Sequence, residues 1–233
     1  MMDESGRRLQ PRMYDSDWLV LRRMRVVITQ LAQRIRTPAK TAIDLGCGSE
    51  PYRPIFDGLG FHYRGADLQG ADIRIGSDGT IEAADASADL VLSFQVLEHV
   101  RDVRRYLGEA RRLLRSDGWL LLSTHGTWLY HPHPQDHRRW TREGLVAELQ
   151  DSGFEMLECV AVVGPLAWTT LVRLTCAYQA CLRIPLLGGA LARSLAVCMN
   201  ARAYVEDLIT PAWVRLDNAC VYVTLSRVRP SAP

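Results

Sequence analysis

An apolar strand that runs directly into two glycines is the feature of this sequence that most constrains the fold. Thr41-Ala-Ile-Asp-Leu45 predicts a buried strand, which Gly46-Cys47-Gly48 ends. Glycines let the backbone turn sharply and approach a ligand closely. Asp67 follows at the end of the next expected strand, where a carboxylate can bind both hydroxyls of a ribose. This arrangement predicts an open α/β sheet with a nucleoside site at its carboxyl edge.

Strand-like and helix-like segments alternate along most of the chain. Apolar runs predict a strand at 41–45 and a second strand that ends at Asp67. Further strands are predicted at 71–75, 89–94, 119–124, 154–163 and 219–226. Helical periodicity is found at 16–36, 52–59, 102–115 and 141–151. Such alternation, with right-handed connections, predicts a doubly wound α/β sheet of seven mostly parallel strands with helices on both faces.

Additional segments lie before the first strand and before the last one. Residues 1–14 are polar and are expected to be loose, while 1–37 as a whole is expected to form an N-terminal helical cap. The main domain is expected to cover 38–233, with an apolar helical insert at 165–215. No internal repeat is visible, so nothing in the sequence predicts an array of small units.

The residues around the glycines indicate which nucleoside the site binds. A dinucleotide fingerprint needs a third glycine so that the phosphates can lie on the next helix, and Pro51 occupies that position. Asp44 stands two residues before Gly46, where it would repel a pyrophosphate but suit a cationic ligand that carries an amine. S-adenosylmethionine has a sulfonium, an amino group and no phosphate. The charges therefore favour this cofactor over a nicotinamide dinucleotide.

Several motifs resemble class I S-adenosylmethionine-dependent methyltransferases of the ubiquinone/menaquinone type. They are Asp44-Leu-Gly-Cys-Gly48, Gly65-Ala-Asp67 and the stretches 88–100 and 112–122. The tract 124–141 is similar to a subgroup associated with bacterial glycan and lipid biosynthesis. The resemblance covers about residues 38–163 and the final strand. It implies a Rossmann-like methyltransferase sheet whose last strand is antiparallel.

The same resemblance implies a role for each residue of the cofactor site. The first loop, with Asp44, Leu45, Gly46, Cys47 and Gly48, would surround the methionine part of the cofactor. Asp67 and Leu68 would bind the ribose, and Asp78 and Gly79 would lie near the adenine. Ser93, Phe94 and Gln95, at the end of the fourth strand, would surround the sulfonium. The chain departs from the pattern after Asp67, because the segment before the third strand is too short for the usual helix.

Four of the six histidines lie between His125 and His137, in the loop after the fifth strand. One imidazole can serve as a general base, with His125 as the first candidate and His99 as the second. A metal site is an alternative, with ligands from His131, His133, His137 and Asp136. Alternate prolines splay these side chains, so we expect no metal. The third interpretation is structural, with prolines that stiffen the loop and Asp136 that ties it to nearby arginines.

The insert before the last strand is apolar and basic. Between residues 161 and 199 there is no acidic residue, and the only charges are Arg173, Arg183 and Arg193. Pro185 and two following glycines interrupt it, which argues against a membrane-spanning helix. Two interpretations stay open for 165–200. It forms a helical pair that caps the sheet or makes a homodimer face, or it lies on a membrane surface with Trp168 and Tyr178 at the headgroups.

Composition limits the partners and the compartment. Basic and acidic side chains number 28 and 26, and this near balance argues against a nucleic-acid-binding surface. All basic residues except Lys40 are arginine, which fits codon bias or bidentate anion contacts. Six cysteines without CxxC spacing, and no signal-like apolar run at the start, predict reduced thiols and a cytoplasmic protein, or one held at the inner face of the membrane.

Taken together, these features predict an enzyme of the EC 2.1.1 class. It would transfer a methyl group from S-adenosylmethionine to a hydroxyl of a small-molecule, glycan or lipid-linked acceptor. The tetrad that adenine-methylating enzymes carry after the fourth strand is replaced by Ser93-Phe-Gln-Val96, which argues against nucleic acid as the substrate. The alternative function is a non-catalytic S-adenosylmethionine-binding subunit with a regulatory or assembly role.

Overall fold

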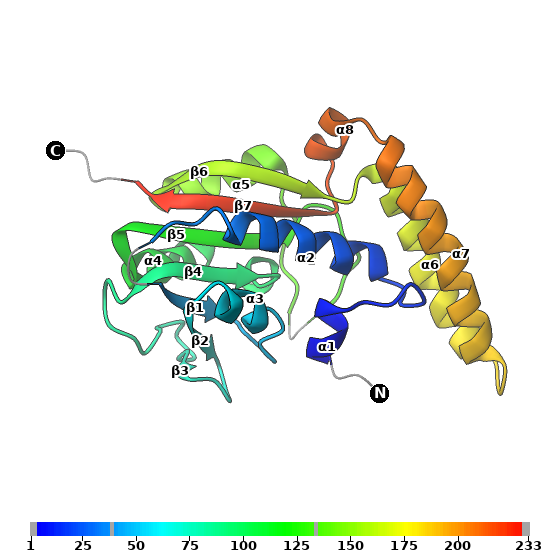
Figure 1. Ribbon diagram of the computed structural model, residues 1–233, viewed down its shortest axis with the longest axis horizontal. Coiled ribbons are helices and arrows are strands. Elements are labelled where there is room, and N and C mark those ends of the chain that lie inside the picture. Colours follow the sequence, from blue (N-terminus) through cyan, green and yellow to red (C-terminus); the bar gives the residue numbers. More distant parts are fainter. Residues whose placement is uncertain (1–3, 38–39, 133–134, 230–233) are drawn as a thin grey trace.

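The computed structural model describes residues 4–37, 40–132 and 135–229. Seven strands form one sheet in the order β3-β2-β1-β4-β5-β7-β6 (Figure 1). The strands are β1 Thr41–Leu45, β2 His62–Asp67, β3 Ile73–Arg74, β4 Ala88–Phe94, β5 Leu114–His125, β6 Phe154–Val162 and β7 Val221–Val228. Neighbours from β3 to β5 pair in parallel, and β7 is antiparallel to both β5 and β6. The predicted seven-stranded sheet with an antiparallel last strand is confirmed.

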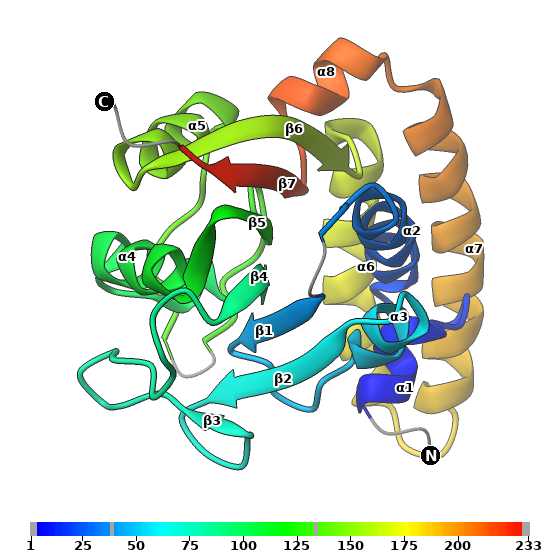
Figure 2. The ribbon, with the colours of Figure 1, turned by 60° about the vertical axis from the view of Figure 1, so that its left-hand side comes forward.

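Helices cover both faces of this sheet (Figure 2). They are α1 Glu4–Leu9, α2 Trp18–Ala32, α3 Arg53–Gly58, α4 Val103–Leu113, α5 Arg142–Asp151, α6 Pro165–Leu182, α7 Gly188–Ile209 and α8 Ala212–Asp217, with the short 3-10 helix η1 at Leu97–His99. Alternate strand residues face opposite sides, so Ala42 joins the core beneath α2, α3 and α6, and Ile43 joins the core beneath α4 and α5.

Two helix starts show how local sequence fixes the ends of elements. Asp102 accepts a hydrogen bond from the backbone N–H of Arg105 and so caps α4. Thr141 likewise accepts from the N–H of Gly144 and caps α5, as its position before an apolar pattern predicted. Each cap satisfies a backbone donor that the first helical turn leaves without a partner.

The structure differs from expectation at the N-terminal end. Residues 1–14 are expected to be loose, but the described part of this segment contains α1, and α1 is held against α2 and the residue before it. Arg7 Nη1 pairs with Asp17 Oδ1 at 2.7 Å, and Arg25 Nη1 donates to the carbonyl of Leu9 at 2.7 Å. These contacts come from residues distant in sequence, so no local pattern could reveal them. The division of the chain into a cap, 1–37, and a main domain, 38–233, stays a prediction. In the structure, α2 of the expected cap packs into the same core as the sheet.

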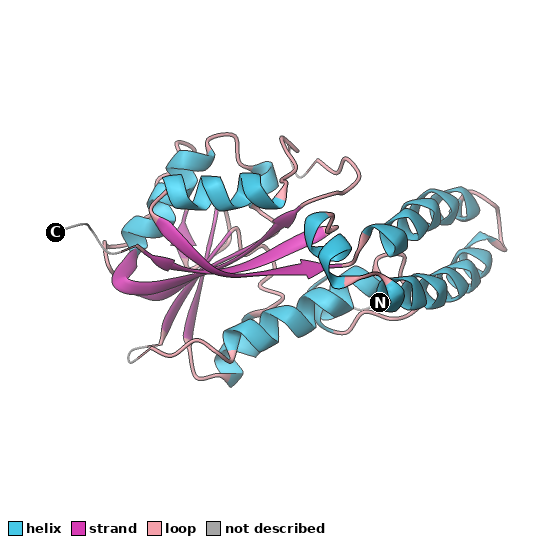
Figure 3. Cartoon of the chain, turned by 90° about the horizontal axis from the view of Figure 1, so that it is seen from above, coloured by secondary structure: helices cyan, strands magenta, loops and turns pink. Residues whose placement is uncertain are grey.

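The insert folds into a long helical hairpin, α6 and α7, that projects beyond the sheet (Figures 1 and 3). Its turn lies between Leu182 and Gly188, where the proline and the glycines predicted an interruption. Within the described residues, no helix is long and apolar enough to cross a membrane. Trp168 is only 8% exposed, and its ring stacks on Trp128 at 4.8 Å between centroids, so its prediction as a headgroup residue is wrong.

Candidate functional site

A cavity of about 150 Å³ lies at the carboxyl ends of β1 and β4. Six of the residues predicted to bind the cofactor line it: Asp44, Gly46, Cys47, Gly48, Phe94 and Gln95. A larger open hollow of about 690 Å³ lies beside α4 and the end of α5, and none of the predicted site residues lines it. The cavity at the strand ends is the candidate site, because open α/β sheets bind ligands there.

The glycines of the first loop have the backbone conformations that the sequence implied. Gly46 has a φ of +70° and Gly48 a φ of +52°, both in the region that favours glycine. A Cβ at Gly46 would lie 2.7 Å from Val96 Cγ2, so no larger residue fits between β1 and the end of β4. A Cβ at Gly48 would meet no atom within 4 Å among the described residues. The backbone at Gly48 is therefore open on the side where a ligand could approach.

Asp44 contributes a buried carboxylate to the cavity. The side chain is in the core, with the residue 2% exposed, and Tyr63 donates its hydroxyl to Oδ2 at 2.5 Å. Within the described residues, no hydrogen bond reaches Oδ1. Burial raises the pKa of Asp44 to about 7, and the Tyr63 hydrogen bond opposes that rise. A buried acceptor without a donor beside a cavity fits the ammonium group of an amino-acid ligand.

Asp67 lies at the end of β2, across the glycine loop from Asp44. Its Oδ2 accepts from the N–H of Gly48 at 2.8 Å, and its Oδ1 accepts from the N–H of Leu68 at 2.7 Å. An ionised carboxylate has about four lone-pair sites, so two remain for a ligand diol. The two backbone bonds hold the carboxylate beside the open face of Gly48, as a ribose-binding role requires. Neither Asp67 nor the half-exposed Leu68 is among the residues that line the cavity.

Asp78 and Gly79 lie in a turn outside the cavity lining. Asp78 accepts from the hydroxyl of Thr80 at 2.7 Å and from Arg105 Nη2 at 2.8 Å. The hydrogen bonds from Thr80, followed by the charge of Arg105, lower the pKa of this carboxyl. Gly79 has a φ of +87°, which the turn requires. The structure thus shows an ion pair with α4 at Asp78, and the predicted contact with adenine stays a prediction.

The end of β4 supplies the residues predicted to surround the sulfonium. Ser93 Oγ lies 2.8 Å from the hydroxyl of Tyr106, and it faces away from solvent. Phe94 packs edge-on against Tyr52 at 4.9 Å between ring centroids. Gln95 has a φ of +57°, which is rare outside glycine, and its backbone N–H donates to the carbonyl of Ser123 at 3.0 Å. Such backbone strain is concentrated at functional sites in proteins.

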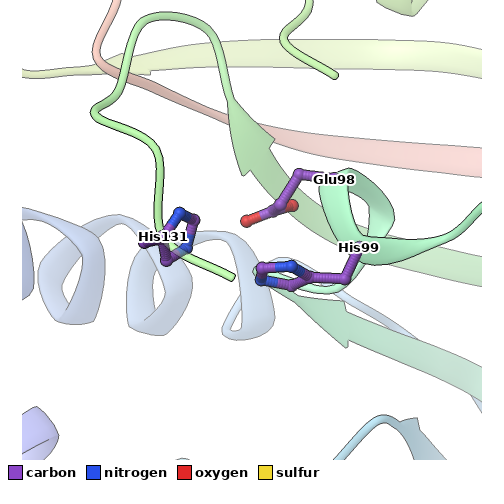
Figure 4. A group of neighbouring side chains, drawn as sticks. All are labelled: Glu98, His99 and His131. Atoms are coloured by element: carbon purple, nitrogen blue, oxygen red, sulfur yellow. The ribbon is translucent and has the colours of Figure 1, made fainter. Parts of the chain in front are cut away.

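Glu98 lies at the centre of a cluster of histidines beside this strand end (Figure 4). Thr124 Oγ1 donates to Glu98 Oε2 at 2.9 Å, and His125 Nδ1 lies 3.0 Å from Oε1. Glu98 is fully buried, and burial raises its pKa to about 7. One ligand atom from each of Glu98, His99 and His131 lies within 4.8 Å of the others. The structure therefore joins residues of η1 to the loop after β5.

The histidines of this cluster have different environments. The imidazole of His99 is partly exposed, and its Nδ1 lies 2.6 Å from the carbonyl oxygen of Gln135. A carbonyl can only accept, so Nδ1 carries the proton and Nε2 of neutral His99 carries the lone pair. His125 is buried, its ring stacks on Trp128 at 5.2 Å, and burial lowers its pKa. The described residues provide no hydrogen bond to Nε2 of His99, whereas the imidazole of His125 is enclosed between Glu98 and Trp128.

The metal set considered from the sequence does not form among the described residues. His133 lies outside them, and Asp136 pairs with Arg139 through both carboxylate oxygens, at 2.5 and 2.7 Å. The exposed His137 donates its backbone N–H to the carbonyl of Glu98. Glu98, His99 and His131 are the groups that could hold a cation here, through one carboxylate and two imidazoles.

Sequence reasoning missed several residues of the site. Arg8, Ser49, Pro51 and Tyr52 also line the cavity, and Glu98 lies at the centre of the histidine cluster. Position alone could have indicated the residues from Ser49 to Tyr52, because they continue the glycine loop. Arg8 is far upstream of Asp44 in a polar segment, and no motif connects the two.

Comparisons with known proteins agree with this geometry. The sequence profile of a family described as a methyltransferase domain matches residues 19–159. A probable S-adenosylmethionine-dependent methyltransferase of Mycolicibacterium smegmatis is 27% identical over 176 residues, which are 68% of this chain and 67% of the relative. A ubiquinone biosynthesis O-methyltransferase of Paraburkholderia phytofirmans is 28% identical over 102 residues, 36% of this chain and 44% of the relative. The chain thus spans about two thirds of the first relative's length and less than half of the second's.

A solved structure shares the fold over most of the chain. It is the 1,6-didemethyltoxoflavin-N1-methyltransferase of Burkholderia thailandensis, with 1,6-didemethyltoxoflavin and S-adenosylhomocysteine bound. The TM-score is 0.56 at 16% identity, and the match covers 89% of this chain and 78% of that one. At this identity the likeness shows the fold alone. The family profile covers more than half of the chain, so the chain belongs to the methyltransferase domain family and is an S-adenosylmethionine-dependent methyltransferase.

Proposed function

We propose that this enzyme methylates a hydroxyl oxygen of a small-molecule, glycan or lipid-linked acceptor. The observation that carries the proposal is the contact between His99 Nδ1 and the carbonyl of Gln135, which leaves Nε2 as a proton acceptor. His99 is four residues after Gln95, which lines the cavity. A hydroxyl must lose its proton as it is methylated, so a base at this point favours an oxygen acceptor.

The residues around the cavity fit S-adenosylmethionine. Asp44 Oδ1 would accept from the ammonium group, the open backbone at Gly48 would lie against the ligand, and Asp67 would bind the ribose hydroxyls. Arg8 lines the same cavity, and its guanidinium suits the ligand carboxylate. The cofactor supplies a methyl group on a sulfonium, which is an activated electrophile. The protein then needs to orient the acceptor and remove one proton.

We assign the base role to His99 and a positioning role to His125. His125 was the first candidate from the sequence, but its imidazole is enclosed and its Nδ1 faces Glu98 at 3.0 Å. Through that contact and its stacking on Trp128, His125 would fix both Glu98 and the loop after β5. His99 would take the hydroxyl proton on Nε2 while the Gln135 carbonyl stabilises the imidazolium through Nδ1.

One relative and one tract of the sequence support a hydroxyl of a small-molecule, glycan or lipid-linked compound as the acceptor. The Paraburkholderia phytofirmans relative is named as an O-methyltransferase. The tract 124–141, which contains the histidine loop, is similar to glycan and lipid-biosynthesis enzymes. A lipid-linked acceptor would also bring the enzyme to a membrane surface.

The test is release of S-adenosylhomocysteine in the presence of candidate acceptors. The panel contains phenols, free sugars, lipid-linked sugars and matched amines that carry nitrogen in place of the hydroxyl. We expect turnover with at least one hydroxyl acceptor and none with its amine counterpart. Turnover with amines alone would overturn the oxygen assignment. Tight binding of S-adenosylhomocysteine with no turnover on any acceptor would favour the non-catalytic alternative.

The affinity for S-adenosylhomocysteine is expected to rise with pH through the titration of Asp44. The pKa of Asp44 is raised to about 7, so its ionised fraction, and with it the affinity for an ammonium, should increase about eightfold from pH 6 to pH 7.5. Isothermal titration calorimetry at several pH values measures this change. D44N should bind more weakly and with no such slope. An equal slope in D44N would contradict the assignment.

The raised pKa of Asp44 also determines the direction in which the stability of the protein changes with pH. A carboxyl whose pKa is higher in the folded state binds a proton more tightly there, so the free energy of unfolding falls as pH rises from about 4 to about 7. Glu98 has the same direction of shift and contributes to the same fall. Because the two carboxyls share this signature, ligand affinity is the measurement that isolates Asp44.

A further inference from the structure

The turn of the α6–α7 hairpin exposes an unusual concentration of apolar side chains. Leu186 is fully exposed, at 103%, and Leu187 is 65% exposed. Leu182, Ile184 and Leu191 are each about half exposed, at 48%, 46% and 48%. We call residues 182–191 the hairpin tip. It lies at the end of the hairpin, away from the sheet (Figures 1 and 3).

Leu186 is unfavourable at its position in two ways. Its φ is +61°, in the left-handed region where glycine and asparagine are common and leucine is rare. Its side chain is also fully in contact with water. Neither feature stabilises the described chain, and glycines occur only two residues further on, at Gly188 and Gly189. A fully exposed leucine in a strained backbone conformation points to a binding role outside the fold.

The charge of the hairpin indicates what the tip binds. From residue 159 to residue 205 the chain contains four arginines and no acidic residue. Arg183 lies in the tip and is exposed, and Arg173 is exposed further along α6. Arg193 is on α7, with its guanidinium 5.5 Å from the centre of the Tyr14 ring. Exposed apolar side chains flanked only by positive charge match an anionic lipid surface.

A second copy of the chain is a less suitable partner for the hairpin tip than a lipid bilayer. A stable protein interface buries about 800 Å² on each partner, across roughly 20–30 residues. The tip offers five apolar side chains at a narrow turn, which is too few for such an interface. A bilayer needs no complementary shape, and side chains at a turn can enter it without a large flat surface.

We propose that the hairpin tip inserts Leu186 and Leu187 into the headgroup region of an anionic bilayer. Arg183 would lie at the level of the lipid phosphates. The root of the hairpin is connected to the histidine cluster, because Trp168 of α6 stacks on Trp128 and Trp128 stacks on His125. The hairpin would thus hold the acceptor side of the enzyme near the membrane. This inference does not depend on the identity of the acceptor.

Vesicle flotation tests the proposal. The probes are vesicles of phosphatidylcholine alone and vesicles in which phosphatidylglycerol replaces part of the phosphatidylcholine. We expect the wild type to float with the anionic vesicles, and L186N/L187N and R183Q each to reduce the bound fraction at least tenfold. The matched control is L157N, which removes a leucine that is 50% exposed on β6, and it should bind like the wild type.

Thermal unfolding separates this role from a structural one. Asparagine tolerates the left-handed region, so L186N should unfold at the same temperature as the wild type or about 2–4 °C higher. Turnover on a water-soluble acceptor should be unchanged, which keeps this test independent of the proposed reaction. Failure of the wild type to float, or equal flotation of L186N/L187N, would overturn the proposal. So would sedimentation showing a dimer that L186N/L187N abolishes.

Discussion

Replacement of His99 by alanine is expected to lower kcat at least about 100-fold, in line with the usual contribution of a general base. The affinity for S-adenosylhomocysteine should stay within about twofold, because His99 is not among the residues that line the cavity. The physical reason is the loss of the Nε2 lone pair that the Gln135 carbonyl leaves available. Initial rates and calorimetry measure the two quantities.

Two matched variants distinguish a base role of His99 from the effect of losing another histidine of the cluster. H137A removes an exposed histidine of the same loop whose backbone alone contacts Glu98, and it should retain turnover. H125A removes a positioning group and should lower turnover about tenfold, with a lower temperature of unfolding because a buried ring is lost. Added imidazole should partly restore H99A. Turnover of H99A equal to that of H137A would remove His99 from the mechanism.

Dialysis against EDTA distinguishes a base from a metal ligand. Glu98, His99 and His131 are close enough to hold a cation, and a metal-bound hydroxyl could also lose its proton there. A general base requires no metal, so we expect full turnover after dialysis. Loss of turnover that zinc or magnesium restores would assign His99 to metal binding instead.

The histidine cluster shows where sequence reasoning fails. Spacing along the chain grouped His131 with its neighbours in the loop. The structure shows its contact with Asp136, where Nδ1 lies 3.5 Å from Oδ2, and it also brings His131 beside Glu98 and His99. β4 and β5 are parallel neighbours, so their carboxyl ends meet at one edge, and the segments that follow them come together. The rings of His99 and His131, which are distant in the sequence, therefore lie 4.9 Å apart between centroids. Only the sheet order reveals this pairing.

The cofactor loop was predictable for the opposite reason. Gly46 and Gly48 require their conformations because of the turn that they form themselves, so local sequence carries the information. Asp67 follows from one strand pairing, between β1 and β2, which adjacent strands of this fold make. Arg8 reaches the cavity through α1, whose position depends on contacts with α2 and with the segment between them. The sequence contains no pattern for such contacts.

Replacement of Asp67 by alanine is expected to weaken binding of S-adenosylhomocysteine about 100-fold. Two hydrogen bonds to a charged acceptor contribute roughly 1.5–3 kcal/mol each, and their loss is offset in part by water that replaces the carboxylate. D67N keeps one acceptor oxygen and should lose about tenfold. D57N, which changes a half-exposed carboxylate on α3, is the matched control and should bind like the wild type.

Asp67 also accepts from the backbone of Gly48 and Leu68, so a structural role must be separated from a binding role. A structural role predicts that D67A lowers the unfolding temperature of the free protein and weakens binding only as far as the loop is displaced. A binding role predicts a second signature, since a ligand without the ribose hydroxyls should bind wild type and D67A equally. We therefore compare S-adenosylhomocysteine with its 2′,3′-dideoxy analogue. If D67A weakens both ligands by the same factor, the carboxylate shapes the loop and does not hold the ribose.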